Sequence, residues 1–300
     1  MKNPTLKDST ALFLFLTFGL SWLAWFLGAG PANLILDVRL WAVHFNFSIK
    51  VLLQWIGIFV PGLSALFLVF QSSDRRQLWH FLKRSFLGAS SLKPSLLALV
   101  IAMSASLPTI LVYRPNLSAA NLVLRFLLNT AVNLALAPLW EEIGWRGFLF
   151  PRIQSAFGTL WSCLITGLIW GFWHLPLRTA FGTSHNTSRL VYFAFFCAYA
   201  GAASFVLGWL YNRARGVLLP CIVLHSAINA MSDIVDEPVM RIVGLAPLLL
   251  STVMLALIAF FLHSFLPNQL SNLPDTGAVN GRVARDDESE SLKSPFDRTT

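Results

Sequence analysis

The chain has 300 residues, of which 56% are hydrophobic and only 12% are charged, and its mean hydropathy is +0.65. Soluble globular domains carry about 25% charged residues, so this composition excludes an ordinary soluble domain and favours an integral membrane protein. The net charge of +8 does not indicate a nucleic-acid partner, because most Lys and Arg lie in short links between apolar segments. Cations in such links orient a protein in the bilayer.

Eight apolar segments meet or approach the length of about 20 residues that a membrane-spanning helix needs. They cover residues 10–28, 51–70, 94–112, 121–140, 157–175, 189–211, 216–231 and 242–265. We therefore predict an all-α, polytopic membrane protein, a bundle of about eight transmembrane helices with a polar cavity inside the membrane. The first segment is expected to be a retained helix, because no small-residue cleavage site follows it.

Three parts of the chain differ in character. Residues 1–120 carry generic transmembrane helices, residues 121–266 add unusual polar side chains, and residues 267–300 are polar and rich in Pro, Gly and Ser. We expect a catalytic helical bundle in the second part and a disordered cytoplasmic tail in the third, because such a tail buries too little apolar area to offset its ordering entropy. The link "SSDRRQLWHFLKRSF" is read as a positive loop, with a basic amphipathic helix on the membrane surface as the alternative.

The distribution of Lys and Arg among the links predicts an orientation. With eight spans, the links on the side of the N-terminus carry Lys2, Lys7, Arg75, Arg76, Lys83, Arg84, Lys93, Arg152, Arg213 and Arg215. The opposite side carries Arg39, Lys50, Arg114, Arg178, Arg189 and Arg241. This excess places both termini in the cytoplasm, with the chain in the cell membrane.

The first unusual stretch is "LAPLWEEIGWRGFLF", residues 136–150, where Glu141, Glu142 and Arg146 interrupt an apolar run. An ionisable residue at the bilayer centre costs at least about 2.5–3.5 kcal/mol and usually marks function. Glu142 and Arg146 are spaced i, i+4 in the favourable order for an intrahelical ion pair. Glu142 is therefore expected to pair with Arg146, which leaves Glu141 for chemistry. The structural alternative is that all three residues mark the exit of a helix into the headgroups.

Two further apolar segments carry polar groups. In "LIWGFWHLP", His174 stands four residues after Trp170, and in "LPCIVLHSAIN", His225 and Asn229 are also spaced i, i+4. Residues at that spacing share one face of a helix. Each site alone has a bland explanation, an interfacial histidine or a packing contact between helices. Together with the acids they supply a base for water and hydrogen-bond donors for an oxyanion, which are the parts for hydrolysis.

The three motifs, in this order, resemble those of the CPBP family, which contains the CAAX prenyl proteases and bacteriocin-processing enzymes and is also called the Abi family. "EEIGWR" matches EExxxR, "WGFWH" resembles FxxxH with Trp170 in place of Phe, and "HSAIN" matches HxxxN. The likeness covers about residues 121–235. It implies an intramembrane endopeptidase in which Glu141 is the base, His174 assists it, and His225 and Asn229 hold the oxyanion. Glu142 and Arg146 complete the first motif.

The mechanism predicted from these residues is peptide-bond hydrolysis by a water that Glu141 deprotonates. Cys163, Cys197 and Cys221 lie in separate apolar segments without a CxxC pair, and we interpret them as buried small hydrophobes. Cys221 is the nearest rival nucleophile, four residues before His225. Glu141, His174 and His225 also make a possible zinc set, although the HExxH spacing is absent. The sequence leaves the metal open.

The predicted partners are membrane lipid and a membrane-associated peptide or protein, which would be prenylated if the host makes such a substrate. Two other functions stay open at this point. Buried Glu, Arg and His also build proton relays in transporters, and a non-catalytic immunity or scaffold protein is the third alternative. One geometric mismatch accompanies the predicted spans. His174 lies ~24 Å along the fifth span from the cytoplasmic side, whereas Glu141 and His225 lie ~10–15 Å from that side.

Overall fold

The computed structural model describes residues 6–29, 35–40, 43–72, 75–87, 91–113, 117–180, 189–234 and 246–265. These residues are helical except for turns and one antiparallel hairpin, formed by β1 (Ile35–Leu40) and β2 (Val43–Ser48) in the link after the first helix. The predicted all-α membrane fold is therefore confirmed, with this hairpin as an addition. The tail predicted to be disordered lies outside the described residues.

Five long helices correspond to predicted spans. They are α1 (Leu6–Gly28), α2 (Ile49–Ser72), α4 (Leu92–Tyr113), α9 (Arg189–Arg213) and α12 (Ala246–Phe265). Together with the helical stretch from Ala137 to Trp173, they make six segments in the described residues that are long and apolar enough to cross a membrane. The apolar helix α10 (Leu219–Ile234) is shorter. The chain is thus a multi-pass membrane protein, and the number of eight spans stays a prediction.

The basic link after α2 forms a helix of its own, α3 (Arg75–Phe86). Its end is tied to the start of α10, because the Leu218 N–H donates to the Ser85 carbonyl at 2.8 Å. The helical alternative for this link is therefore confirmed. Its place on the membrane surface stays a prediction.

The predicted limits of the fourth and fifth spans are wrong. α5 (Ala119–Asn133) ends before residue 140, and a new helix, α6 (Ala137–Glu142), begins after a short turn. Pro138 stands in its first turn, where the absent N–H has no helical partner to lose. The helix continues as a π-helical segment η2 (Ile143–Leu149) and then as α7 (Phe150–Trp173). The two acids therefore lie near the beginning of a helix rather than at its exit.

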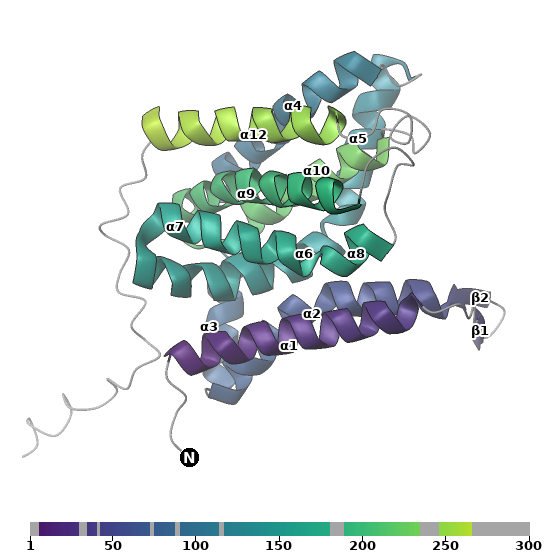
Figure 1. Cartoon of the computed structure of the whole chain (residues 1–300), viewed down its shortest axis with the longest axis vertical. Helices are drawn as coiled ribbons and strands as arrows, with labels where there is room; N and C mark the ends of the chain where they lie inside the picture. The colour runs from purple at the N-terminus through teal and green to yellow at the C-terminus, as the bar shows by residue number, and fades with distance from the viewer. Residues whose placement is uncertain are drawn as a thin grey trace, which may run out of the picture. The chain divides into compact units, whose positions relative to one another are not determined.

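A glycine breaks α7 into two arms. Gly158 has φ 75° and ψ 175°, a conformation essentially restricted to glycine. Glu141 precedes this point by 17 residues and His174 follows it by 16, so each lies ~24 Å along its own arm. The ribbon turns back on itself there, which brings the ends of the two arms together (Figure 1). The mismatch between the depths of Glu141 and His174 thus came from the wrong span limits.

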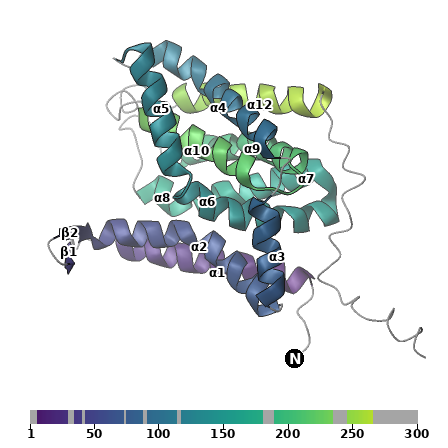
Figure 2. The same ribbon diagram turned by 180° about the vertical axis from the view of Figure 1, so that it is seen from behind.

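The helices around these arms form a packed bundle. α1 packs beside α2, both α7 and α12 pack on α9, and α10 packs on α4 and α5 (Figures 1 and 2). The helices of residues 1–120 therefore contact the helices that carry the motifs. A close approach involves Gly144, whose absent Cβ would lie 2.7 Å from Pro61 of α2. A glycine in the EEIGWR motif lets η2 lie against α2.

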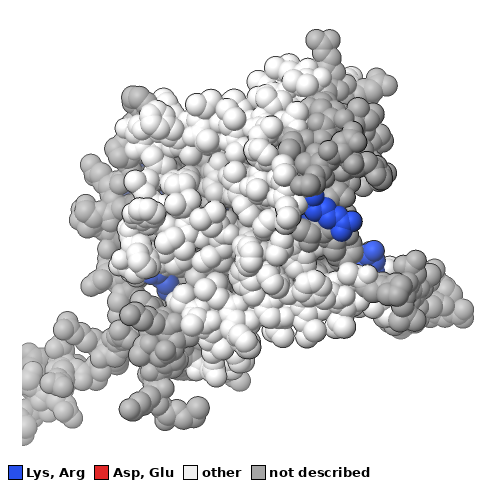
Figure 3. Space-filling model, in the orientation of Figure 1, with Lys and Arg blue, Asp and Glu red and all other residues white. Residues whose placement is uncertain are grey.

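One face of the molecule is almost free of charge, with a few Lys and Arg at its margins (Figure 3). Large apolar side chains are exposed along the helices, among them Phe15, Phe157 and Phe260. Soluble monomers rarely expose apolar patches larger than a few hundred Å². Contact with lipid explains this surface.

The break at Gly158 gives a prediction for stability. Nothing lies within 4 Å of a Cβ built at this position, so Gly158→Ala should destabilise only through backbone strain, by about 1–3 kcal/mol. Gly19→Ala is the matched control, since its Cβ also meets nothing within 4 Å and its backbone is helical. Thermal unfolding in detergent should show a lower midpoint for the first variant and an equal or higher one for the second. Equal midpoints for both would contradict the strain.

Candidate active site

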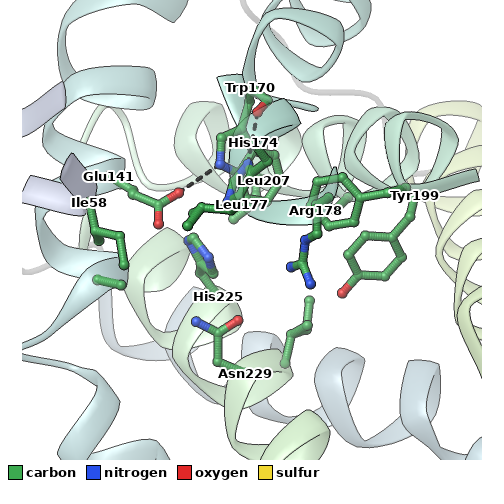
Figure 4. A pocket seen from close by; sticks show the side chains of 14 residues that line it. Ile58, Glu141, Trp170, His174, Leu177, Arg178, Tyr199, Leu207, His225 and Asn229 are labelled. Atoms are coloured by element: carbon green, nitrogen blue, oxygen red, sulfur yellow. Dashed lines mark hydrogen bonds between the residues drawn. The ribbon is translucent and has the colours of Figure 1, made fainter. Parts of the chain in front are cut away.

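A cavity of about 280 Å³ lies where α6, α7, α8 (Leu175–Ala180), α9 and α10 meet (Figure 4). Its size is at the lower end of ligand pockets, which are about 300–1,000 Å³. Its lining comprises Ile58, Ala137, Glu141, Trp170, His174, Leu177, Arg178, Phe196, Tyr199, Ala203, Leu207, His225, Ile228 and Asn229. All four residues predicted to be catalytic are in this set, although they come from three segments of the chain.

Glu142 and Arg146, which complete the first motif, lie outside the cavity lining as a buried ion pair. Arg146 Nη1 and Glu142 Oε1 are 3.1 Å apart, and both side chains are 0% exposed. The same carboxylate oxygen lies 2.9 Å from His225 Nδ1. The pairing of Glu142 with Arg146 therefore forms as the spacing predicted. The contact with His225 links the first motif to the third, which the sequence did not show.

The carboxylate of Glu141 is held by the tryptophan of the second motif. Trp170 Nε1 donates to Glu141 Oε2 at 2.7 Å, and the other carboxylate oxygen faces the cavity (Figure 4). The indole also contacts the remaining polar groups. Its ring centroid lies 4.9 Å from Arg146 Cζ, 5.7 Å from the ring of His174 and 5.2 Å from the ring of His225. A phenylalanine, as in the FxxxH motif, would keep these ring contacts and lose the N–H.

The orientation of the His174 ring follows from a hydrogen bond of its Nδ1. Its Nδ1 lies 2.9 Å from the Trp170 carbonyl, and a carbonyl oxygen can only accept. Nδ1 therefore carries the hydrogen, and in the neutral ring Nε2 has a free lone pair. Since His174 lines the cavity, this nitrogen is available to accept a proton there.

His225 and Asn229 line the cavity from α10, one turn apart. His225 Nδ1 donates to Glu142 Oε1. The other ring nitrogen, Nε2, is therefore the one that can contact a ligand in the cavity. Only the imidazolium carries a hydrogen on both nitrogens, so donation from Nε2 to an oxyanion uses the protonated ring. The amide of Asn229 supplies a second donor without titrating.

Two polar residues of the lining were not identified from the sequence. The sequence predicts Arg178 in a link on the far side of the membrane and Tyr199 within a span, yet both side chains line the cavity. The spacing of Arg178 from His174, i and i+4 across a short helix, was the available signal. Nothing in the sequence around Tyr199 points to the cavity.

The rival nucleophile Cys221 lies outside the cavity lining. Its thiol is fully buried and donates to the Leu207 carbonyl at 3.3 Å. A nucleophilic thiolate needs an exposed, electropositive environment. Cys221 is therefore placed as a packing residue, as the sequence suggested.

A catalytic zinc would need Glu141, His174 and His225 to be grouped around one ion. In the described parts of the chain, no three His, Cys, Asp or Glu side chains are grouped closely enough to hold a metal ion. Glu141, His174 and His225 share the cavity but are not gathered as a three-ligand site. Their arrangement does not fit the closely grouped ligands of a catalytic zinc.

Two comparisons with known proteins found similarity. The family model described as "Type II CAAX prenyl endopeptidase Rce1-like" matches residues 123–231, which contain all three motifs. A "CAAX prenyl protease 2" from Methanococcus maripaludis is 22% identical over 245 residues, an alignment that covers 76% of this chain and 85% of the relative. Both matches support a membrane protease. They favour it over the transporter and the non-catalytic scaffold.

The buried ion pair predicts a stability cycle. Arg146→Met leaves the Glu142 carboxylate without its cation, and breaking a buried pair on one side costs about 3–5 kcal/mol. The double variant Glu142→Gln/Arg146→Met removes both charges and should lose less than the sum of the two single variants. Arg213→Met, at an exposed arginine at the end of α9, is the control and should change stability by less than about 0.5 kcal/mol. Thermal or denaturant unfolding in detergent gives the stability of the two single variants, the double variant and the control. If the losses of the two single variants add up in the double variant, the ion pair does not couple Glu142 to Arg146.

Proposed function

We propose that this chain is a member of the CPBP family of CAAX-type membrane proteases and hydrolyses a peptide bond with a water that Glu141 activates. The observation that carries the proposal is the meeting of Glu141, His174, His225 and Asn229 on one cavity. The printed name of the Methanococcus relative makes an S-prenylated peptide with a CAAX ending the first substrate to test. The cavity is lined by residues of apolar helices, which suits a membrane-associated substrate.

In the first step, the free oxygen of Glu141 accepts a proton from water, and the hydroxide attacks the scissile carbonyl carbon. Trp170 holds the other oxygen of Glu141, so the carboxylate has one acting oxygen in a fixed direction. His174 Nε2 accepts a hydrogen bond from the same water and orients its lone pair. Positioned groups of this kind contribute about 10²–10⁴-fold to a hydrolysis rate.

In the second step, the negative charge on the former carbonyl oxygen is stabilised by His225 Nε2–H and the Asn229 amide. Fixed donors in a water-poor site are effective, and removing one such donor costs about 10²–10³-fold in kcat. The proton on Glu141 then passes to the leaving nitrogen as the C–N bond breaks. The products are a carboxylic acid and an amine, and Glu141 is a carboxylate again.

The assignment of the base predicts a clean loss of activity. Glu141→Gln keeps the size of the side chain and the bond from Trp170 but cannot accept the proton, so hydrolysis of a prenylated CAAX peptide should fall to background. The unfolding midpoint should stay near that of the wild type. Cys221→Ala is the matched control and should keep activity, because this thiol lies outside the cavity lining. Full activity of Glu141→Gln, or loss in Cys221→Ala without unfolding, would reject the mechanism.

The same mechanism predicts independence from metal. The protein is dialysed against a strong chelator until it holds less than about 0.1 mole of zinc and other divalent metals per mole of protein. It should then hydrolyse the peptide at an unchanged rate. The reason is that the proton acceptor and both oxyanion donors are side chains of the protein. A loss of activity that added zinc restores would show that the resting donor set is rearranged around a metal in the active enzyme.

A further inference from the structure

We propose that Arg178 binds a carboxylate of the substrate, so that the cavity selects peptides with an anionic group close to the scissile bond. The inference rests on the proposed function, because it names the substrate class of the same cavity. Nothing in the three motifs requires this arginine. It comes from α8, one helical turn after His174, and its side chain lines the cavity.

The guanidinium of Arg178 is held in place but is not satisfied. Its Cζ lies 4.2 Å from the ring centroid of Phe196, which also lines the cavity. Its Nε is buried without a hydrogen-bond partner, while its backbone N–H donates to the His174 carbonyl at 2.9 Å. The stacked ring fixes the plane of the guanidinium and leaves its donors for a ligand.

The charges around this group favour an anion. Among the residues the structure describes, no carboxylate forms an ion pair with Arg178, and the second cation near the cavity, Arg146, is already paired with Glu142. The one carboxylate in the lining is Glu141, which is engaged by Trp170. An unpaired cation in an apolar environment is costly. A ligand that brings a negative charge removes this cost.

Two neutral side chains that can donate hydrogen bonds line the same cavity as the arginine. The guanidinium points into the cavity between the Asn229 amide and the Tyr199 hydroxyl (Figure 4). Arginine binds a carboxylate through two parallel N–H groups, and the neighbouring hydroxyl and amide can add bonds to the same oxygens. Asn229 belongs to the proposed oxyanion site as well. A carboxylate at Arg178 therefore lies in the same cavity as the carbonyl under attack.

This juxtaposition defines a substrate class. The carboxylate is either the free C-terminus of a peptide cut near its end, or an acidic side chain near the cut. Both present the same two oxygens to the guanidinium. A peptide with a CAAX ending supplies the carboxylate as its free C-terminus.

The kinetic test compares three prenylated peptides of one sequence: a C-terminal acid, a C-terminal amide, and an amide whose last residue is Asp. The wild type should cleave the acid with a kcat/KM about tenfold to hundredfold above that of the plain amide, the range for a hydrogen bond to a charged group. Arg178→Gln should raise KM for the acid by this factor, keep kcat, and leave the plain amide unchanged. Recovery with the Asp-amide shows that an acidic side chain serves, and no recovery shows that the C-terminus is read.

Two control variants separate recognition from surface charge. Arg178→Lys keeps the charge and should retain part of the preference for the acid. Arg189→Gln removes one cation at an exposed position at the start of α9 and should keep the full preference. If Arg178→Gln lowers kcat/KM equally for all three peptides, the arginine has a structural role and the proposal is wrong. The proposal is also wrong if the variant changes kcat/KM only in vesicles that contain anionic lipid, because the arginine then binds lipid headgroups.

A binding experiment tests the site without hydrolysis. In the Glu141→Gln background, the acid should bind about tenfold to hundredfold more tightly than the plain amide, and the added Arg178→Gln change should remove that difference. If the wild type hydrolyses none of the peptides but the acid still binds more tightly than the amide, the proposed reaction is rejected and the carboxylate site is kept. Equal binding of acid and amide to Glu141→Gln would overturn the carboxylate site whatever the reaction.

Discussion

The contact on which the site depends is the buried carboxylate of Glu142, one oxygen of which lies 3.1 Å from Arg146 Nη1 and 2.9 Å from His225 Nδ1. In an apolar bundle neither cation nor anion could be buried alone without a large cost. The shared oxygen joins the beginning of the α6–η2 helix to α10, and it also fixes which nitrogen of His225 faces the cavity. The charges thus organise the site without touching a substrate.

The π-helical segment contributes to this arrangement. Residues Ile143–Leu149 are wound with the wider π spacing, a feature often found at functional sites, and Gly144 in that segment lets α2 lie close. The indole of Trp170 then fills the space between Glu141, Arg146 and the two imidazoles. One aromatic side chain therefore both orients the proposed base and screens the ion pair from the cavity.

The sequence identified most of the cavity-lining side chains that carry hydrogen-bonding groups, and few of their contacts. Motif spacing predicted the pair of Glu142 with Arg146, because both residues lie on one helix and i, i+4 geometry is local. It did not predict the contact of Glu142 with His225, which are 83 residues apart, or that of Glu141 with Trp170, which are 29 apart. Spacing along a chain carries no information on such pairs. Arg178 was missed although its i, i+4 spacing from His174 was a local signal, because the sequence did not show that α8 lines the cavity.

Composition and apolar segment lengths by themselves determined the membrane class and the helical fold, because lipid leaves backbone groups to satisfy one another within helices. The motifs indicated a resemblance to CAAX-type membrane proteases, which the family model over residues 123–231 supports. Tertiary structure decided where those helices begin and end around residues 134–158, since the break at Gly158 depends on a backbone angle that hydropathy does not report. It also decided that the two arms return to one depth, which places Glu141 beside Trp170. A cavity is a property of packed helices, and so its lining is visible only once they pack.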